Sequence, residues 1–213
     1  MYRIINDNIS SIINSANRSR DIEPYLTLQS IFQNGSILNN SNYKTTYRIY
    51  WQLNAARLSD NYCDHYFRVL EKYRNRDDQD VEGVVKALYE VSSNSKDKKT
   101  LQFSFATKLL HTIDNTRPIY DSLIADFYFL PQIKPTWKYD KKLSAYLKAY
   151  DFIQQEHKRV INDNILSTAI TRFRTHFDLP ATYTDQKIID TLLWKFTSFL
   201  RAGAIREGKI KYS

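Results

Sequence analysis

Glycine and cysteine are scarce in this chain of 213 residues, which has four glycines and a single cysteine. The lone Cys63 excludes an intramolecular disulfide and any zinc site built on paired cysteines. It fits a reducing compartment, so we expect a cytoplasmic protein. Because Cys63 is a small apolar residue in a helical stretch, we expect it to serve packing.

Several catalytic and cofactor-binding patterns are missing as well. The four histidines are widely separated, and no HExxH pattern or cysteine pair accompanies them, so the sequence predicts no metal site. No glycine-rich phosphate loop and no GxSxG elbow occurs, which argues against nucleotide hydrolysis and serine hydrolysis. We therefore expect neither a metal ion nor a small-molecule cofactor.

Long apolar runs are also absent. No window approaches the roughly 18 apolar residues that a membrane-spanning helix needs. The first residues, MYRIINDNISSIINSANRSR, scatter Asn and Asp among their apolar positions, unlike the continuous apolar core of a secretory signal. We expect no membrane association and no export.

Helical periodicity, in contrast, runs along the whole chain. Apolar and aromatic residues recur at three-to-four spacing in three stretches: Ile4, Ile5, Ile9, Ile12 and Ile13; Tyr47, Tyr50, Trp51, Asn54 and Leu58; Leu192, Phe196, Phe199 and Leu200. Ser59, Asp80 and Thr184 each precede such a stretch and supply a side-chain oxygen for a helix N-cap. Helix stops are marked by Gly35, the stretch around Asp77, Pro131 with Pro135, Pro180 and Gly203.

The predicted fold class is all-α. No alternating run is long enough to demand a sheet, and no two runs flank an Asn-Gly turn. We expect a compact bundle of about nine or ten helices. A chain of this length can bury one core, so residues 1–213 are expected to form a single helical domain, with two interleaved lobes as the alternative. The loop from Pro131 to Pro135 is the expected lobe boundary.

The formal charge is +8 at pH 7, and the sequence pI is about 9.4. Basic residues gather in two loops and the tail: Lys96, Lys98 and Lys99; Lys138, Lys141 and Lys142; Arg201, Arg206, Lys209 and Lys211. Such clusters favour a polyanionic partner, although lysine-rich loops are also often only solvated. Sixteen tyrosines add aromatic surface on which unpaired bases could stack, but most of them are expected in the core.

The most informative stretch is residues 103–122, FSFATKLLHTIDNTRPIYDS. An apolar stripe of Phe103, Ala106, Leu109, Leu110 and Ile113 predicts a helix, with Ser104, Lys108 and His111 on another side that could face a cleft. The helix should end near Asp114 to Thr116. After Pro118 the chain is expected to run extended, and Asp121 stands where the N-cap of the next helix belongs.

The runs FATKLLH and PIYDS within this stretch resemble the helix-hairpin-helix superfamily of DNA glycosylases, especially its 8-oxoguanine-glycosylase-like branch. The run IDTLLW, from Ile189 to Trp194, is similar to a carboxy-terminal helix of such proteins. The resemblance implies a DNA partner, extrusion of a damaged base and cleavage of its N-glycosidic bond. Asp121 matches the essential aspartate of the superfamily. Lys108 is the candidate amine for a Schiff base, and without it a water would attack.

The hairpin of the resemblance is degenerate here. Where the superfamily has a glycine-rich turn, this chain has SSNSKDKKTLQFSF, so Lys96, Lys98 and Lys99 would replace amide contacts to phosphate by charge. The family's lysine lies nearer Ser104 or Phe105, which makes Asp121 the better match. His111, Arg117 and Trp137 complete the residues expected at a nucleic-acid surface.

Two functions therefore remain open at the level of sequence. The first is a DNA-glycosylase-like enzyme that uses Asp121, with or without Lys108. The second is a non-catalytic basic helical module that binds nucleic acid or a protein partner. The sequence leaves the lesion, the choice of DNA or RNA and the oligomeric state open.

Overall fold

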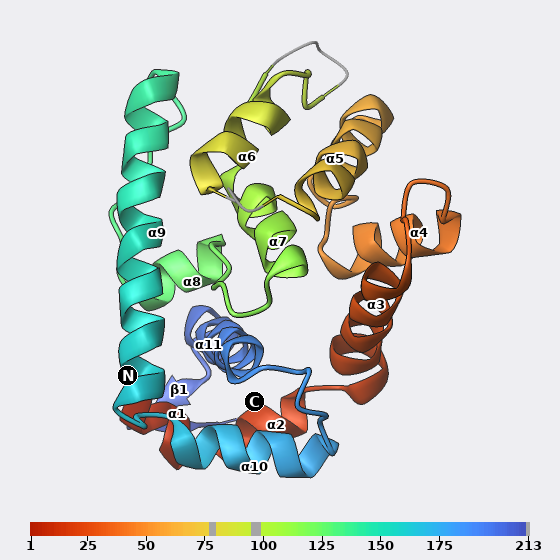
Figure 1. The fold of residues 1–213 in the computed structure, drawn as a ribbon. Coiled ribbons are helices and arrows are strands. Elements are labelled where there is room, and N and C mark those ends of the chain that lie inside the picture. Colours follow the sequence, from red (N-terminus) through yellow and green to blue (C-terminus); the bar gives the residue numbers. More distant parts are fainter. Residues whose placement is uncertain (77–79, 95–98, 212–213) are drawn as a thin grey trace. The chain divides into compact units, whose positions relative to one another are not determined.

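The computed structural model describes residues 1–76, 80–94 and 99–211, and these residues form an almost entirely helical protein (Figure 1). The elements are α1 (Tyr2–Asp7), α2 (Ile9–Ser15), a π turn η1 (Arg18–Ile22), α3 (Glu23–Asn34), α4 (Ser41–Tyr50), α5 (Asp60–Tyr73), α6 (Val81–Tyr89), α7 (Phe103–Ile113), α8 (Ser122–Phe127), α9 (Tyr139–Asn162), α10 (Ser167–Phe177), α11 (Asp185–Arg201), β1 (Ile205–Arg206) and β2 (Lys209–Ile210). The predicted all-α class is confirmed. No helix among the described residues is long and apolar enough to cross a membrane.

Three helices begin where side-chain caps were predicted. The Ser59 hydroxyl accepts the Tyr62 amide at 3.1 Å, Asp80 accepts the Gly83 amide at 2.7 Å, and Thr184 accepts the Lys187 amide at 3.2 Å. Each oxygen satisfies one of the amide groups that a helix start leaves without an intrahelical partner. Local sequence thus sets the starts of α5, α6 and α11.

The described chain divides into two compact units with interleaved segments. Unit 1 contains residues 1–18, 115–132 and 149–213, and unit 2 contains residues 19–114 and 133–148. One passage between the units falls between Gln132 and Ile133, inside the loop from Pro131 to Pro135. Another falls between Asp114 and Asn115, directly after α7.

The core of unit 1 is built on α11, which packs against α8, α10 and α2. Its core residues are almost fully buried: Ile188, Ile189, Leu192, Leu193 and Phe196. Burial of an aliphatic or phenyl side chain of this size contributes about 1.5–3 kcal/mol relative to exposure. This apolar face is therefore what fixes α8, and with it Asp121, against α11.

A short β-ribbon near the end of unit 1 was not predicted. Ile205 pairs with Ile210, and the connecting residues Glu207 and Gly208 both have positive φ, of 51° and 72°. Each strand has only two residues, which is too few for the alternation of apolar and polar residues that marks a strand in the sequence. Buried Asn8, far away in sequence, holds the ribbon by donating to the Gly208 carbonyl at 2.8 Å and accepting the Ile210 amide at 2.9 Å. The ribbon depends on this distant amide, which is why local reading missed it.

Unit 2 has an aromatic core. In it, α3 packs on α4, and the three helices α5, α6 and α7 pack on one another. Tyr47 is central to it: its hydroxyl is 2.8 Å from the Tyr66 hydroxyl and 3.0 Å from the Thr112 hydroxyl. Tyr66 in turn donates to the Phe105 carbonyl at 3.0 Å. These bonds satisfy phenol groups that would otherwise be costly to bury. Cys63, as expected, is a buried free thiol whose pKa burial raises.

The helical period from Tyr47 to Leu58 overstated the length of α4. The helix ends at Tyr50, with Trp51 as its C-cap, and the Leu53 amide bonds back to the Arg48 carbonyl at 2.9 Å. Gln52 has a φ of 61°, which an α-helix does not allow. Trp51 and Leu53 are nevertheless buried, so the apolar spacing served packing rather than helix extension.

Candidate functional site

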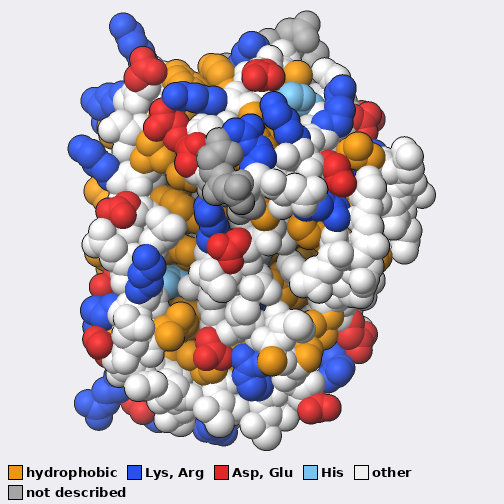
Figure 2. Space-filling view, viewed as in Figure 1, with side chains coloured by type: hydrophobic (Ala, Val, Ile, Leu, Met, Phe, Trp, Pro, Cys, Tyr) orange, Lys and Arg blue, Asp and Glu red, His pale blue; other side chains and the backbone are white. Residues whose placement is uncertain are grey.

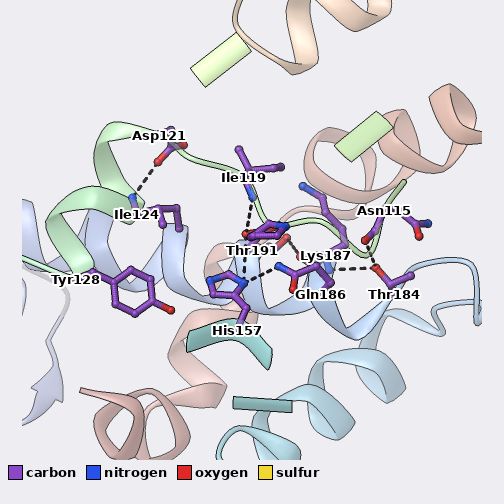
Figure 3. A network of polar contacts seen from close by, with 12 residues as sticks. Asn115, Ile119, Asp121, Ile124, Tyr128, His157, Thr184, Gln186, Lys187 and Thr191 are labelled. Atoms are coloured by element: carbon purple, nitrogen blue, oxygen red, sulfur yellow. Dashed lines mark hydrogen bonds and ion pairs between the residues drawn. The ribbon is translucent and has the colours of Figure 1, made fainter. Parts of the chain in front are cut away.

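Asp121 stands at the N-cap of α8, as the sequence predicted. Its Oδ1 accepts the Ile124 amide at 2.9 Å, and its side chain is only partly buried (Figure 3). The preceding helix α7 ends at Ile113, and Asp114 is its C-cap, which also agrees with the prediction. A carboxylate held by a cap bond and still open to solvent is fixed in place and accessible to a substrate.

The segment before Asp121 is anchored along its backbone. The Tyr150 hydroxyl donates to the Pro118 carbonyl at 3.0 Å, and the Ile119 amide donates to Asp190 Oδ1 at 3.4 Å. Further back, the Thr184 hydroxyl donates to the Asn115 carbonyl at 2.8 Å. These partners come from α9 and from the start and second turn of α11, so three points of unit 1 hold the approach to Asp121.

Next to this segment lies a buried polar cluster of unit 1, made of His157, Gln186, Lys187 and Asp190, the first three of which are labelled in Figure 3. His157 Nδ1 is 2.6 Å from Gln186 Nε2 and 4.0 Å from Asp190 Oδ1. His157 is 1% exposed and Asp190 is 4% exposed. The cluster therefore sits in a low-dielectric environment, where charge is expensive.

Burial changes the protonation of both titratable partners. It raises the pKa of Asp190 to about 7, against the opposing effects of Lys187, the Ile119 amide and Gln186, while the charge of Asp121 adds to the rise. It lowers the pKa of His157 to about 4, so the imidazole is neutral near pH 7. The 4.0 Å contact between His157 and Asp190 is accordingly not an ion pair at neutral pH.

This arrangement puts two carboxyl groups with unlike environments near one another. Asp190 is buried and holds its proton toward neutral pH, and Asp121 is partly exposed. Pairs of this kind divide acid and base roles in hydrolytic enzymes. Asp190 also fixes the backbone of Ile119, two residues before Asp121.

The polar cluster was missed as a unit by sequence reasoning, which used Asp190 only as part of the IDTLLW resemblance. A signal did exist, because Gln186 and Lys187 stand one turn before Asp190 on the same helix and so lie near it on its surface. His157 had no such signal. Its position on α9 becomes meaningful only once α9 and α11 are packed together.

Lys108 lies in unit 2, whereas Asp121 lies in unit 1. Its Nζ donates to the Trp51 carbonyl at 3.1 Å and lies 5.0 Å from the centre of the Phe105 ring. The side chain is half-buried among these groups. The structure thus gives Lys108 partners inside its own unit.

His111 departs from the expected surface position. Its side chain is fully buried, and its Nε2 is 3.1 Å from the Tyr25 hydroxyl. The rings of Tyr25 and Trp51 pack around it. The prediction that Ser104, Lys108 and His111 share an open side of α7 is therefore wrong for His111, which is withdrawn as a phosphate contact because nothing can reach it there.

The other predicted nucleic-acid residues are divided between the units. Lys99 and Trp137 lie in unit 2, where Lys99 is exposed and Trp137 is half-exposed. Arg117 lies in unit 1 and is half-buried. Lys96 and Lys98, like the helix stop expected near Asp77, lie outside the described residues.

No group of three or more His, Cys, Asp or Glu side chains within residues 1–76, 80–94 and 99–211 is placed to hold a metal ion. Comparison with protein-family models, curated proteins and solved structures gave no significant match to this chain. The chemistry of the chain must therefore be argued from its own residues.

Proposed function

We propose that this protein is a DNA-glycosylase-like base-excision protein in which Asp121 is the catalytic carboxylate. The observation that carries the proposal is the anchored segment before Asp121. Hydrogen bonds to Pro118 and Ile119 and the cap bond to Ile124 fix the carboxylate while its side chain stays partly exposed. Preorganised charge of this kind acts on a transition state without reorganisation at the moment of reaction.

The proposed reaction is hydrolysis of an N-glycosidic bond. As the bond to the base breaks, its electron pair leaves with the base and positive charge develops on the sugar. The Asp121 carboxylate stabilises that charge and orients a water, whose oxygen bonds to the anomeric carbon. The proton that this water releases passes to the departing base, so the overall reaction adds one water across the bond.

We assign the nucleophile to water rather than to Lys108. A Schiff base needs a free amine at the reacting carbon. The Lys108 amine already donates to the Trp51 carbonyl at 3.1 Å and lies 5.0 Å from the centre of the Phe105 ring. The lyase version of the chemistry is the alternative that the experiment below separates.

A polyanionic substrate suits the charge of the chain. The formal charge of +8 favours association with phosphate backbones at long range. Exposed lysines are available on both units, among them Lys99, Lys138 and Lys209. These residues supply affinity, whereas Asp121 supplies the chemistry.

The test incubates the protein with duplex oligonucleotides that contain 8-oxoguanine, uracil or an abasic site, with and without borohydride. Asp121→Asn is the main variant, because Asn retains an N-cap oxygen and removes the charge. We expect base release by the wild type, loss of release in Asp121→Asn, and DNA affinity within about twofold in both, since Asp121 does not contact phosphate.

The same experiment decides between the alternatives. A borohydride-trapped adduct that disappears in Lys108→Gln would transfer the nucleophile to Lys108. Neither base release nor adduct on any substrate, with retained DNA affinity, would overturn the enzyme and favour the second function, a non-catalytic basic helical module. Asp163→Asn, exposed in the same unit, is the matched control and should leave base release unchanged.

A further inference from the structure

Two aromatic rings of unit 2 meet where α6 ends and α9 begins, and a third, Trp137, lies just before α9 in sequence. The rings of Tyr89 and Tyr139 have their centres 4.4 Å apart at an interplanar angle of 44°. Trp137 precedes Tyr139 by two residues. All three side chains are partly exposed, unlike the buried tyrosines Tyr47 and Tyr66 of the same unit. Aromatic rings kept at the surface are available to a ligand.

Lysines surround these rings. Lys141 Nζ lies 4.3 Å from the centre of the Trp137 ring, and Lys99 Nζ lies 6.0 Å from the centre of the Tyr89 ring. Lys138, between Trp137 and Tyr139, is exposed as well. Figure 2 shows Lys and Arg side chains, with Asp and Glu side chains among them, over the upper part of this face, where Figure 1 places α6 and the first turns of α9.

The charge of these lysines is largely uncompensated. Within the part of the chain that the structure describes, Lys99, Lys138 and Lys141 take part in no salt bridge. Acids close to these side chains include Glu82, which pairs with Lys86 at 2.6 Å, exposed Asp140 and exposed Glu90, which follows Tyr89. The surface formed by Tyr89, Trp137, Tyr139, Lys99, Lys138 and Lys141 is called the Trp137 surface below.

We propose that the Trp137 surface binds a nucleic-acid strand through its unpaired bases. Bases stack on the exposed rings, and the lysines neutralise the phosphates between them. Rings alternating with uncompensated cations match an unpaired strand rather than a duplex, because bases inside a duplex are already stacked. Lys141, on a flexible exposed stem, leaves the Trp137 ring when a base takes its place and then contacts the adjoining phosphate.

This inference goes beyond the proposed function, because strand binding on unit 2 requires no chemistry at Asp121. The two proposals fail separately: base release tests Asp121, and the binding measurements below test the Trp137 surface. Catalytically silent Asp121→Asn protein should bind an unpaired strand as the wild type does.

The test measures the affinity of the full chain for a labelled oligothymidylate of about 15 nucleotides, within the site size of strand-binding surfaces. A duplex of equal length and base-free polyphosphate are measured in parallel. We expect Trp137→Ala to weaken oligothymidylate binding by about tenfold or more, the loss of one stacked base, and Trp137→Phe to restore part of it. Binding to polyphosphate should change by less than about twofold, because it has no bases.

Lysine variants probe the phosphate part of the surface. Lys138→Gln and Lys141→Gln should each reduce the salt dependence of oligothymidylate binding by about 0.7 in slope. Trp194→Phe and Lys158→Gln, both in unit 1, are the matched controls and should change neither value. Unchanged oligothymidylate affinity in Trp137→Ala, or an equal loss for polyphosphate, overturns the proposal. Tighter binding of the duplex than of the oligothymidylate does so too.

Discussion

At the residue scale, Asp190 and His157 shift their proton affinities in opposite directions inside one cluster. Asp190 has a folded pKa of about 7 against 3.8 for the free side chain, so folding binds an extra proton between these values. His157 has a folded pKa of about 4 against 6.5, so unfolding binds an extra proton in nearly the same window. The two effects on the free energy of unfolding oppose each other between about pH 4 and about pH 6.5.

Removing either group should expose the pH dependence of the other. In Asp190→Asn only His157 remains, and its contribution to the free energy of unfolding is present above about pH 6.5 and is lost as the pH falls toward about 4. In His157→Gln only Asp190 remains, and its contribution is present near pH 4 and is lost as the pH rises through about 7. Each slope is at most about 1.4 kcal/mol per pH unit.

Urea unfolding across this pH range measures both slopes relative to the wild type. The comparison with the wild type cancels the titration of all other groups. Parallel curves for all three proteins would contradict the protonation states assigned to the cluster. Glu156 is next to His157 in sequence but only partly buried. Glu156→Gln therefore tests whether removing a carboxyl without deep burial changes the pH dependence of the free energy of unfolding as Asp190→Asn does.

Two substitutions of Asp121 should distinguish its effect on stability from its proposed role in the reaction. Asp121→Ala removes the cap bond to Ile124 and is expected to lower the free energy of unfolding by about 1 kcal/mol. Asp121→Asn keeps an oxygen for the cap and should cost much less, although both variants remove the carboxylate that the proposed reaction needs. Urea denaturation of both proteins checks this. Equal losses of stability would mean that the negative charge, rather than the cap bond, holds α8.

At the element scale, α11 is the helix that organises unit 1. One of its faces buries the apolar core, and another carries the polar cluster with Gln186, Lys187 and Asp190. The N-cap of α11 is equally important, because the Thr184 hydroxyl both accepts a hydrogen bond from the Lys187 amide and donates one to the Asn115 carbonyl. A single hydroxyl thus links the start of α11 to the segment that leads to Asp121.

Thr184→Ala should therefore cost more than the loss of a simple cap. We expect about 2 kcal/mol, against about 1 kcal/mol for Asp121→Ala in the same unit, because the first change removes two hydrogen bonds and the second removes one. Thr184→Ser preserves both bonds and is the matched control. The midpoint of urea unfolding reports the difference, and equal losses would show that the bond to Asn115 contributes nothing.

At the scale of the whole molecule, charge is the property that bears most on the proposed function. The formal charge of +8 is spread over exposed lysines and arginines of both units. Each phosphate neutralised on duplex DNA contributes about −0.9 to the slope of log affinity against log salt. A protein that only carries solvated lysines would show almost no such slope.

We expect DNA affinity to fall with salt at a slope of about −3 or steeper, which corresponds to three or more phosphate contacts. Asp121→Asn should keep this slope, because Asp121 is assigned to the sugar and not to phosphate. Fluorescence anisotropy with a labelled duplex at increasing salt measures it. A slope shallower than about −1 would contradict a phosphate-binding role for the basic residues.

The sequence by itself determined where several helices begin. Side-chain oxygens before apolar periods placed the N-caps at Ser59, Asp80, Asp121 and Thr184, and each cap depends on residues within one turn of it. The same local rules ended α7 at Ile113. The all-α class followed from the helical period along the chain.

Only the tertiary structure decided which polar side chains are buried together. His157 reaches Gln186 and Asp190 because α9 and α11 meet in unit 1, and His111 is withdrawn from the surface because Tyr25 covers it in unit 2. Asn8 hydrogen-bonds to the β-ribbon, which lies about two hundred positions away in sequence. Burial and distant pairing arise from packing between elements, and a local sequence pattern carries no information about which elements will meet.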